Sequence, residues 1–375
     1  GTTTGTLTVT LSQPAGVPVT MGYATSDGTA TLADNDYVQI ADQTLTIPAG
    51  VTTATITVTV NGDLNFELDE TFNVVLSIPV NGTLGAPAVG VVTITNDDAQ
   101  PIVDLTGPAV GTPEGTTDDT YRTFTFTLSA ESYLPVTVDY TTVDGTIVDF
   151  QALAGDNDYE AQTSAVVFAP GETVQTIQVR VYADNKFEND EDYSVEISGA
   201  TNATVGIDEA FDTIVNDDQV PTVTMMSDLT VIEDVPTVYV TATLSNPSGF
   251  PTILDIIFVD GPAVPPSLFA ANNPADYVPG ATTIAFNPGE TVIGVTNNGL
   301  ASAFVTSGVP APVAIVNDAI DEYDENFTAI LTGPGIGSGP VLPGVDLDAV
   351  ITIIDDDRTP KLLVSDVSVP EAAGV

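Results

Sequence analysis

Three short acidic clusters recur along this chain, and each is followed by a second run of acidic or amide residues. The clusters span residues 63–70, 184–191 and 318–325, and the runs that follow span 96–98, 216–218 and 355–357. Carboxylate oxygens at such short spacing suit Ca²⁺, which takes about six to eight oxygen ligands. Carboxylates held together repel one another unless a cation neutralises them. The clusters therefore predict one type of calcium site, used three times.

Acidic residues also dominate the composition. Asp and Glu number 52 against 5 Lys and Arg, which gives the 375 residues a formal net charge of −47. Nucleic acids and anionic membrane surfaces both attract basic proteins, so we expect no nucleic-acid partner and no direct membrane insertion. The chain has no Cys, so disulfides and thiolate metal sites are excluded. An acidic cytosolic protein of a halophile is the alternative interpretation of this charge.

Apolar and polar residues alternate with a period of two along most of the chain. Leu7, Val9 and Leu11 alternate with threonines, and the same pattern recurs at residues 124–128 and 177–181. This period and the abundance of Thr, Val and Ile favour β-strands, and Asp-Gly and Pro-Gly pairs mark turns between them. With 43% hydrophobic residues, the chain can bury cores rather than remain disordered. The pattern predicts an all-β protein built from β-sandwiches.

The repeat divides the chain into units joined by short proline-containing linkers. We predict a first unit at 1–98, a second at 99–218 and a third at 219–357, followed by the first strand of a further unit at 358–375. Proline linkers restrict the angle between neighbours and favour a rod. The third unit is longer than the others, and its extra residues at 294–312 predict an inserted loop or hairpin.

The opening strand of each unit has its own signature. The second unit opens at residues 102–105 and the third at 223–225, and a Glu follows each opening strand. The first unit has no such strand, whereas residues 362–365, followed by Glu371, repeat the signature at the other end. We therefore expect the chain to be one period of a tandem array, in which a preceding copy supplies the first strand.

These motifs resemble the Calx-β domain. The first unit shows Tyr23-Ala24-Thr25-Ser26-Asp27-Gly28-Thr29-Ala30, Asp34-Asn35-Asp36-Tyr37, Phe66-Glu67-Leu68-Asp69-Glu70-Thr71-Phe72 and Thr93-Ile94-Thr95-Asn96-Asp97-Asp98. The later units add the turn elements Phe168-Ala169-Pro170-Gly171-Glu172-Thr173 and Phe286-Asn287-Pro288-Gly289-Glu290-Thr291. The resemblance implies tandem immunoglobulin-like sandwiches of seven strands, with calcium held by loops at one end of each.

The resemblance also implies a set of calcium ligands in each unit. Those of the first unit would be Asp36, Asp63, Glu67, Glu70, Asp97 and Asp98. Those of the second would be Glu114, Asp158, Asp184, Glu188, Glu191, Asp217 and Asp218, with the main-chain carbonyl of Lys186. Those of the third would be Glu233, Asp276, Asp318, Glu322, Glu325, Asp355, Asp356 and Asp357, and Glu371 would serve the following unit.

Some positions depart from the family pattern. Gly62, Ala183 and Asn317 stand where an acidic residue would strengthen the site, and Asn96 and Asn216 replace the first Asp of the terminal run. Because the number of carboxylates limits the number of cations that a site can hold, we expect about two or three calcium ions per unit.

The resemblance implies a structural role. We expect a calcium-stiffened segment of a long, secreted bacterial surface filament or adhesin, acting in biofilm attachment or gliding motility. Its partners would be calcium ions, neighbouring copies of the repeat, and a surface glycan or protein ligand elsewhere in the parent protein. We expect no enzyme, because metal sites account for the carboxylate pairs and no Trp offers a sugar platform. Two alternatives are a Ca²⁺-responsive regulatory module and a glycan- or protein-binding module that acts through 294–312.

Overall fold

The computed structural model confirms an all-β protein. It describes residues 1–109, 111–145, 153, 155, 157–261, 277–280, 282–292, 311–317, 324–335 and 337–368. Across these residues the secondary structure consists of strands, turns and bends, and no helix is long and apolar enough to span a membrane. The predicted insertion at 294–312 falls largely on residues outside the description.

The second unit is a sandwich of two sheets. One sheet has the order β11-β10-β13-β15-β8 and the other has the order β12-β9-β7-β14. The strands are β7 (Ile102–Thr106), β8 (Thr112–Pro113), β9 (Thr120–Leu128), β10 (Val136–Asp144), β11 (Thr163–Phe168), β12 (Val174–Val181), β13 (Glu191–Thr201), β14 (Thr204–Val205) and β15 (Glu209–Val215). Alternate residues of both sheets meet in one continuous core that includes Phe124, Phe126, Phe168 and Tyr193. The period-two pattern of the sequence therefore places alternate side chains of each strand in the core and on the surface.

The first unit has the same plan with fewer strands. Its sheets have the orders β3-β2-β5-β6 and β1-β4. The strands are β1 (Thr2–Thr10), β2 (Val19–Ser26), β3 (Gln43–Ile47), β4 (Thr53–Asn61), β5 (Glu70–Val80) and β6 (Val89–Ile94). Strand β1 pairs with β4 as β9 pairs with β12, but no strand of the described chain pairs with the other edge of β1. The core is correspondingly divided into two small clusters.

The third unit again forms a sandwich. Its larger sheet has the order β17-β26-β24-β20-β22, and the opposite layer consists of β19-β16-β25 and β18-β23-β21. The strands are β16 (Thr222–Met225), β17 (Leu229–Ile232), β18 (Thr237–Val240), β19 (Ala242–Leu244), β20 (Thr252–Asp260), β21 (Tyr277–Pro279), β22 (Thr283–Phe286), β23 (Ala311–Ile315), β24 (Glu325–Pro334), β25 (Leu342–Pro343) and β26 (Asp348–Ile354). They enclose a single core.

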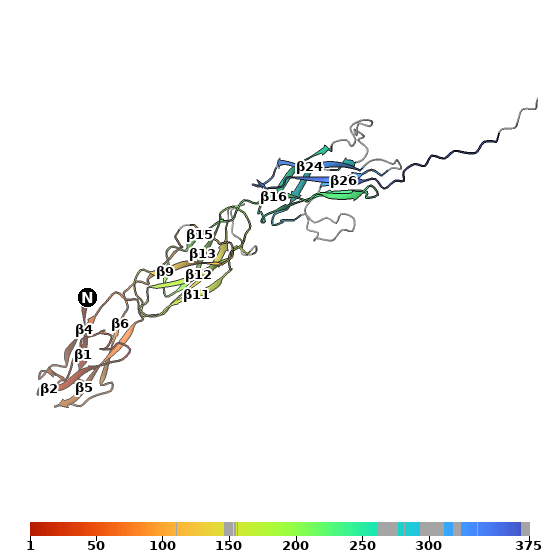
Figure 1. Cartoon of the computed structure of the whole chain (residues 1–375). Coiled ribbons are helices and arrows are strands. Elements are labelled where there is room, and N and C mark those ends of the chain that lie inside the picture. The colour runs from red at the N-terminus through yellow and green to blue at the C-terminus, as the bar shows by residue number, and fades with distance from the viewer. Residues whose placement is uncertain are drawn as a thin grey trace, which may run out of the picture.

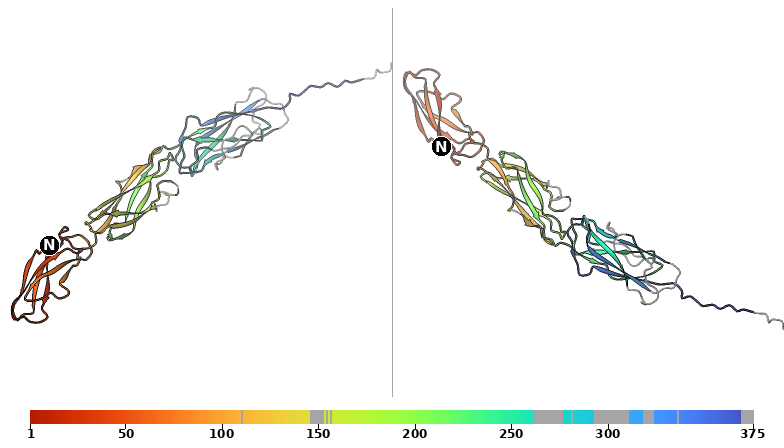
Figure 2. Two further views of the ribbon diagram at one scale, coloured as in Figure 1. Left: turned by 90° about the horizontal axis from the view of Figure 1, so that it is seen from below. Right: turned by 90° about the horizontal axis from the view of Figure 1, so that it is seen from above.

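The three sandwiches follow one another end to end in a gently curved rod (Figure 1). Two further views show the same elongated arrangement, with an extended C-terminal segment projecting beyond the third unit (Figure 2). Gly1 lies near the junction with the second unit rather than at the free end of the rod (Figure 1).

Candidate metal centres

The first element of each site is a tyrosine that joins two loops. The hydroxyl groups of Tyr37 and Tyr159 donate to carboxylates of Asp27 and Asp144, each at 2.6 Å, and that of Tyr277 donates to Asp260 at 2.5 Å. The same tyrosine rings stack on Phe72, Tyr193 and Phe327 in the core. Each tyrosine therefore fixes the position of the residue before it, which is Asp36 in the first unit and Asp158 in the second.

The loop before this tyrosine turns sharply so that the aspartate points inward. Asn35 and Asn157 adopt left-handed backbone conformations, with φ of 66° and 68°, which Asn tolerates better than most residues. The carboxylates of Asp36 and Asp158 accept the amide protons of Thr31 and Leu153 at 2.5 and 2.7 Å. The recurring Asp-Asn-Asp-Tyr sequence is thus a turn that presents one carboxylate.

The acidic clusters form the second loop of each site. The carboxylate of Asp63 accepts the amide proton of Asn65 at 2.7 Å, and Asp184 accepts that of Lys186 at 2.6 Å. These short-range bonds are Asx turns, which fold the loop locally. They fix the position of the first carboxylate of the cluster in the first and second units.

A third group of aspartates connects the acidic loop to the terminal run. Asp69, Asp190 and Asp324 accept the amide protons of Asn96, Asn216 and Asp355 at 3.0, 3.0 and 3.3 Å. Sequence reasoning placed these aspartates in the clusters but assigned them no role. Their position directly before the strand-opening Glu70, Glu191 and Glu325 was the signal that could have indicated a bracing role.

In the second unit the predicted ligands gather into two groups. Carboxylate oxygens of Glu114, Asp184 and Asp218 lie within 4.8 Å of one another, and we call this group the Glu114 cluster. Asp158, Glu188 and Glu191 meet the same limit and form the Glu191 cluster. Asp217 lies beside the first group, where it accepts the amide proton of Gly115 at 3.2 Å. The structure therefore brings together the carboxylates that the sequence predicted for this unit.

Burial and the repulsion of neighbouring carboxylates raise the pKa values of Glu114, Glu191 and Asp218. Burial first, and then the nearby Glu188 and Asp184, raise the pKa of Glu114 to about 8. Burial and Asp158 raise the pKa of Glu191 to about 8, and burial and Asp184 raise that of Asp218 to about 6. Each of these groups would be stabilised as a carboxylate by a cation placed among them.

The structure offers a direct test of whether a cation fits. Glu114 is 3% exposed, and its Oε1 atom has no hydrogen-bond donor. The Oδ2 atoms of Asp218 and Asp357 are likewise buried without a partner. Buried polar atoms are normally paired, so a buried carboxylate oxygen without a hydrogen-bond donor is a position that a cation would satisfy. Three such oxygens lie within the acidic clusters. An oxygen-only donor set of this charge fits Ca²⁺.

One protein cation does enter the second unit's site. The Nζ atom of Lys186 pairs with Glu188 at 2.5 Å. Burial raises the pKa of Glu188 to about 7 even though this contact lowers it. Lys186 was predicted to contribute its main-chain carbonyl, and that contribution stays a prediction. Asn65 is the corresponding residue of the first unit.

Strand β8 and a buried arginine position Glu114. Strand β8 pairs with β15 in parallel, and the amide of Glu114 donates to the Val215 carbonyl at 3.2 Å. The Arg122 guanidinium donates to the carbonyls of Thr112 and Pro113 at 2.8 and 3.0 Å. It also pairs with the buried Asp212 at 3.0 Å. Sequence reasoning missed this arginine, although it is a cation at an inward-facing strand position.

The third unit forms one comparable group. Glu233, Asp355 and Asp357 bring carboxylate oxygens within 4.8 Å of one another. Strand β17 pairs with β26 in parallel, and the Glu233 amide donates to Ile354 at 3.0 Å, as Glu114 does in the second unit. Asp356 has a raised pKa because of burial and the nearby Asp234. Glu325 begins β24, whereas the predicted ligands Asp276, Asp318, Glu322 and Glu371 lie outside the described residues.

The first unit is less complete. Glu70 has its pKa raised to about 7 by burial and then by Asp36 and Glu67, so these three groups are neighbours. Asp36, Asp63, Glu67, Asp97 and Asp98 line a cavity of about 540 Å³. Within the described chain, carboxylate groups as compact as those above occur in the second and third units, not in the first. Glu114 and Glu233 belong to the compact groups of those units, and the counterpart of these residues for the first unit would precede Gly1.

The acidic loops also form the joints between units. Phe66 of the first unit bridges to Ser132 of the second, and Phe187 of the second bridges to Ser248 of the third. The Phe66 carbonyl accepts the Tyr133 amide proton at 3.1 Å, and the Phe187 carbonyl accepts that of Gly249 at 2.8 Å. Phe66 lies between Asp63 and Glu67, and Phe187 between Asp184 and Glu188. One loop therefore carries both predicted metal ligands and the contact with the next unit.

Comparison with solved structures finds similar domains, one of which is described as calcium binding. The crystal structure of CBD12 from CALX1.2 is 21% identical, covers 56% of this chain and 92% of its own, and superposes with a TM-score of 0.26. A second structure of similar likeness, 21% identical over 56% of this chain, is described as the calcium binding domain CBD12 of CALX1.1.

Curated relatives include extracellular matrix proteins and exchangers. Mouse extracellular matrix organizing protein FRAS1 is 26% identical over 71% of this chain, and sea urchin (Lytechinus variegatus) extracellular matrix protein 3 is 29% identical over 50%. Guinea pig (Cavia porcellus) sodium/calcium exchanger 1 is 29% identical over 52%. The chain spans only 7%, 6% and 21% of the lengths of these proteins.

The family models match most of the sequence. The Calx-beta domain model matches residues 1–98, 117–219, 216–298 and 307–357. These matches cover most of each sandwich and the acidic loops described above, although residues 99–116, with β7, β8 and Glu114, lie outside them. They agree with the resemblance in the sequence motifs. The chain therefore belongs to the Calx-beta family and consists of tandem Calx-beta domains.

Proposed function

We propose that this chain is a calcium-binding rod segment of an extracellular protein. The observation that carries the proposal is the set of buried, unpartnered carboxylate oxygens of Glu114, Asp218 and Asp357. Calcium would be held by the Glu114 and Glu191 clusters in the second unit and by Glu233, Asp355 and Asp357 in the third. Bound calcium supplies positive charge that removes the repulsion among these groups.

The position of the sites favours a structural role. The acidic loops of the first and second units contact the next unit through Phe66 and Phe187, so ordering either loop also orders its joint. The joint between the second and third units is further held by Asn246, whose side-chain amide donates to the carbonyls of Asn185 and Gln219 at 3.3 and 2.8 Å. Calcium would therefore hold the units in line and allow the segment to span distance.

The extracellular setting and the adhesive role extend this proposal. Two of the relatives are named as extracellular matrix proteins, and extracellular calcium is high enough to saturate sites with dissociation constants of about 10⁻⁴–10⁻³ M. The segment would project a binding module away from the cell, as in a bacterial adhesin or a gliding-motility filament. Its ligand would bind elsewhere in the parent protein.

Calcium affinity tests this role against that of a regulatory sensor, which the exchanger relatives suggest. We would titrate the intact chain with calcium by calorimetry. Dissociation constants of about 10⁻⁴–10⁻³ M support a structural clamp, whereas values of about 10⁻⁷–10⁻⁵ M favour a sensor. Absence of calcium binding would contradict both roles.

A further inference from the structure

Lys186 is the one basic residue in the three acidic clusters. The chain has only 5 Lys and Arg against 52 Asp and Glu, and the residues that correspond to Lys186 in the other two clusters are Asn65 and Ile320. Asn65 and Lys186 share the same local backbone, because the amide of each donates to the aspartate two residues earlier. The lysine side chain is therefore a feature of the second unit and not a requirement of the turn.

The Lys186 ammonium lies inside the second unit's acidic site. Its Nζ atom contacts Oε2 of Glu188 at 2.5 Å, and the two side chains are 27% and 10% exposed. Burial lowers the pKa of Lys186, but the bond to Glu188 and the charges of neighbouring carboxylates, Asp158 among them, raise it, and the net shift is upward. Lys186 therefore stays charged and places a positive charge beside two members of the Glu191 cluster.

The same ion pair lies against the third unit. At Gly249 an added Cβ atom would lie 3.0 Å from Cβ and 3.4 Å from Oε2 of Glu188, which is the oxygen that Lys186 binds. A Cβ contact as short as 3.0 Å is rare, so glycine at this position leaves room for Glu188 as the ion pair holds it. Glu188 therefore links the ammonium to the second joint.

The residues on either side of Lys186 also belong to the second joint. The Asn185 carbonyl accepts a proton from the side-chain amide of Asn246 at 3.3 Å. The Phe187 carbonyl accepts the Gly249 amide proton at 2.8 Å. This loop thus contacts both the Glu191 cluster and the third unit, so a movement of the loop changes both.

A cation is needed to keep Glu188 in this place. Asp158 and Glu191 belong to the same cluster as Glu188, and like charges at this separation repel one another. The Lys186 ammonium offsets part of that repulsion. A calcium ion at the Glu191 cluster would meet the same carboxylate oxygens, so the ion and the ammonium compete for Glu188.

We propose that Lys186 is a tethered cation that takes the place of calcium at the Glu191 cluster and keeps the second joint formed when calcium is absent. Calcium binds this cluster only by displacing the ammonium from Glu188, so the Glu114 cluster fills first. The second joint therefore depends less on calcium than the first, whose loop has Asn65 at this position. This role of Lys186 rests on the proposed calcium function, and it concerns the side chain rather than the main-chain carbonyl.

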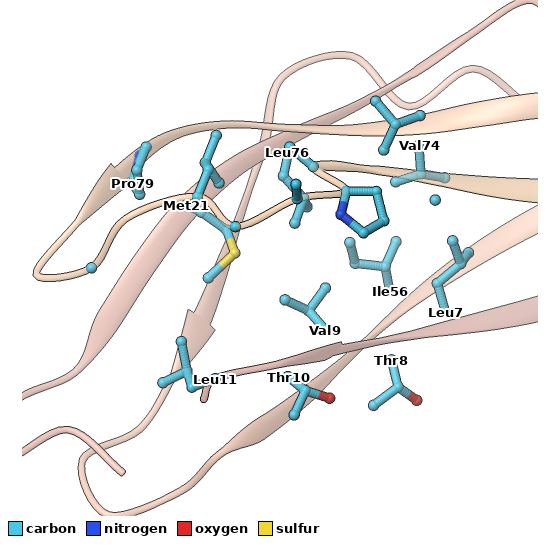
Figure 3. A pocket seen from close by; sticks show the side chains of 18 of the residues that line it. Leu7, Thr8, Val9, Thr10, Leu11, Met21, Ile56, Val74, Leu76 and Pro79 are labelled. Atoms are coloured by element: carbon cyan, nitrogen blue, oxygen red, sulfur yellow. The ribbon is translucent and has the colours of Figure 1, made fainter. Parts of the chain in front are cut away.

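The second unit is a better place to test this role than the first. In the first unit Leu7, Val9 and Leu11 face a cavity of about 420 Å³, with Met21 and Leu76 on its other side (Figure 3). The second unit instead encloses one continuous core. A substitution in the second unit's loop is therefore a cleaner test than a lysine introduced into the loop of the first.

Distances between spin labels measure the second joint in the intact chain, which has no cysteine of its own. Labels at Thr123→Cys and Thr243→Cys lie on exposed strand positions of the second and third units. With Lys186 in place, the distance distribution in chelator should be narrow, and calcium should leave it unchanged. Lys186→Asn should broaden it in chelator, because Glu188 loses its cation, and calcium should narrow it again. Lys361→Asn removes the same charge from an exposed position and is the matched control.

Calorimetry measures the competition between the ammonium and calcium. Lys186→Asn should tighten calcium binding by the second unit at least about tenfold, which corresponds to the usual strength of a hydrogen bond between charged groups. Lys361→Asn should leave the affinity unchanged. Weaker calcium binding by Lys186→Asn, or a joint that stays narrow in chelator, overturns the proposal.

Gly249→Ala is a second variant, and it lies outside the fold of the second unit. Its Cβ atom would press on Glu188, so it should broaden the joint in chelator although Lys186 is present. A joint unchanged by Gly249→Ala would show that Glu188 is not the link. Absence of calcium binding by the unmodified chain would contradict the proposed function, whereas broadening by Lys186→Asn in chelator would still support the role of the ion pair at the joint.

Discussion

The first and second units share the same loops, turns and strand pairings, yet only the second unit has a continuous core and compact carboxylate groups. The described difference lies in one segment, which runs through β7 and β8 to Glu114 and whose counterpart for the first unit would precede Gly1. Its first part supplies Val103 and Leu105 to the core, and its last part supplies a carboxylate to the metal site. The same segment therefore couples packing at one end of the sandwich to metal binding at the other.

This coupling explains why the second unit contains a buried ion pair. Arg122 contacts the carbonyls of Thr112 and Pro113 and holds the end of the segment against β15. The strand pairings align Arg122 with Val238 of the third unit and Asp212 with Ile351. The third unit replaces the ion pair with apolar contacts and secures its segment with the longer strand β17.

The largest expected effect comes from breaking this ion pair. Asp212→Ala leaves the buried Arg122 charge uncompensated and should lower the free energy of unfolding of the second unit by about 3–5 kcal/mol. Replacing both residues as in the third unit, Arg122→Val with Asp212→Ile, should recover most of the loss. Denaturant unfolding of the intact chain measures both. Equal destabilisation by the single and double variants would contradict the inference that apolar residues of the third unit replace the ion pair of the second.

The next effect concerns Glu114, which the first unit lacks. Glu114→Gln removes one carboxylate ligand and should weaken calcium binding by the second unit at least about tenfold. In chelator the same variant should raise the melting temperature of that unit, because it removes a buried charge from a repelling group. Asp139→Asn, at an exposed strand position with the same change in charge, is the control. Lower stability of Glu114→Gln in both conditions would argue against a metal role for Glu114.

The pKa shifts predict a pH dependence that calcium should remove. In chelator, Glu114 and Glu191 bind protons more tightly in the folded state, with pKa values of about 8, than in the unfolded state. Folding stability of the second unit should therefore decrease as pH rises from about 4.5 to 8, on the order of 1 kcal/mol per pH unit for each group. Calcium should flatten this slope. Melting curves in chelator that rise with pH over this range would contradict the assignment.

The smallest effect distinguishes the two joints. Asn246 contacts Asn185 and Gln219 across the second joint, whereas the corresponding residue of the first joint is Ala130. Asn246→Ala should cost about 0.5–1.5 kcal/mol and widen the range of angles between the second and third units. Spin-label distances across each joint would measure this change. The first joint provides the internal reference, and an unchanged second joint would mean that Asn246 does not restrain it.

The sequence allowed prediction of features that repeat. Period-two alternation predicted the strands, because each sandwich face buries every second residue, and the all-β fold is confirmed. The acidic clusters predicted a metal site in each unit, and the resemblance to the Calx-β domain implied which carboxylates would meet in the second unit. The pairing of the acidic loops with the next unit through Phe66 and Phe187 was not predicted, because contacts between separate domains leave no period in the sequence.

The remaining features depend on contacts between residues that lie far apart in the sequence. Asp69, Asp190 and Asp324 look like further ligands, and only the backbone geometry shows that they brace the terminal run. Arg122 occupies a position that period two marks as buried and apolar, and its partner Asp212 is distant in sequence. The assignment of ligands at Asp276, Asp318, Glu322 and Glu371 stays a prediction.

Thermal unfolding of the intact chain in chelator, followed by titration with calcium, tests the central claim most directly. Binding to the folded state alone raises stability by mass action, so the melting temperatures of the second and third units should rise and saturate near millimolar calcium. The first unit, for which residues 1–375 contain no counterpart of Glu114, should shift least when this chain is measured. Melting curves that are identical in chelator and in excess calcium would show that the acidic clusters are not metal sites.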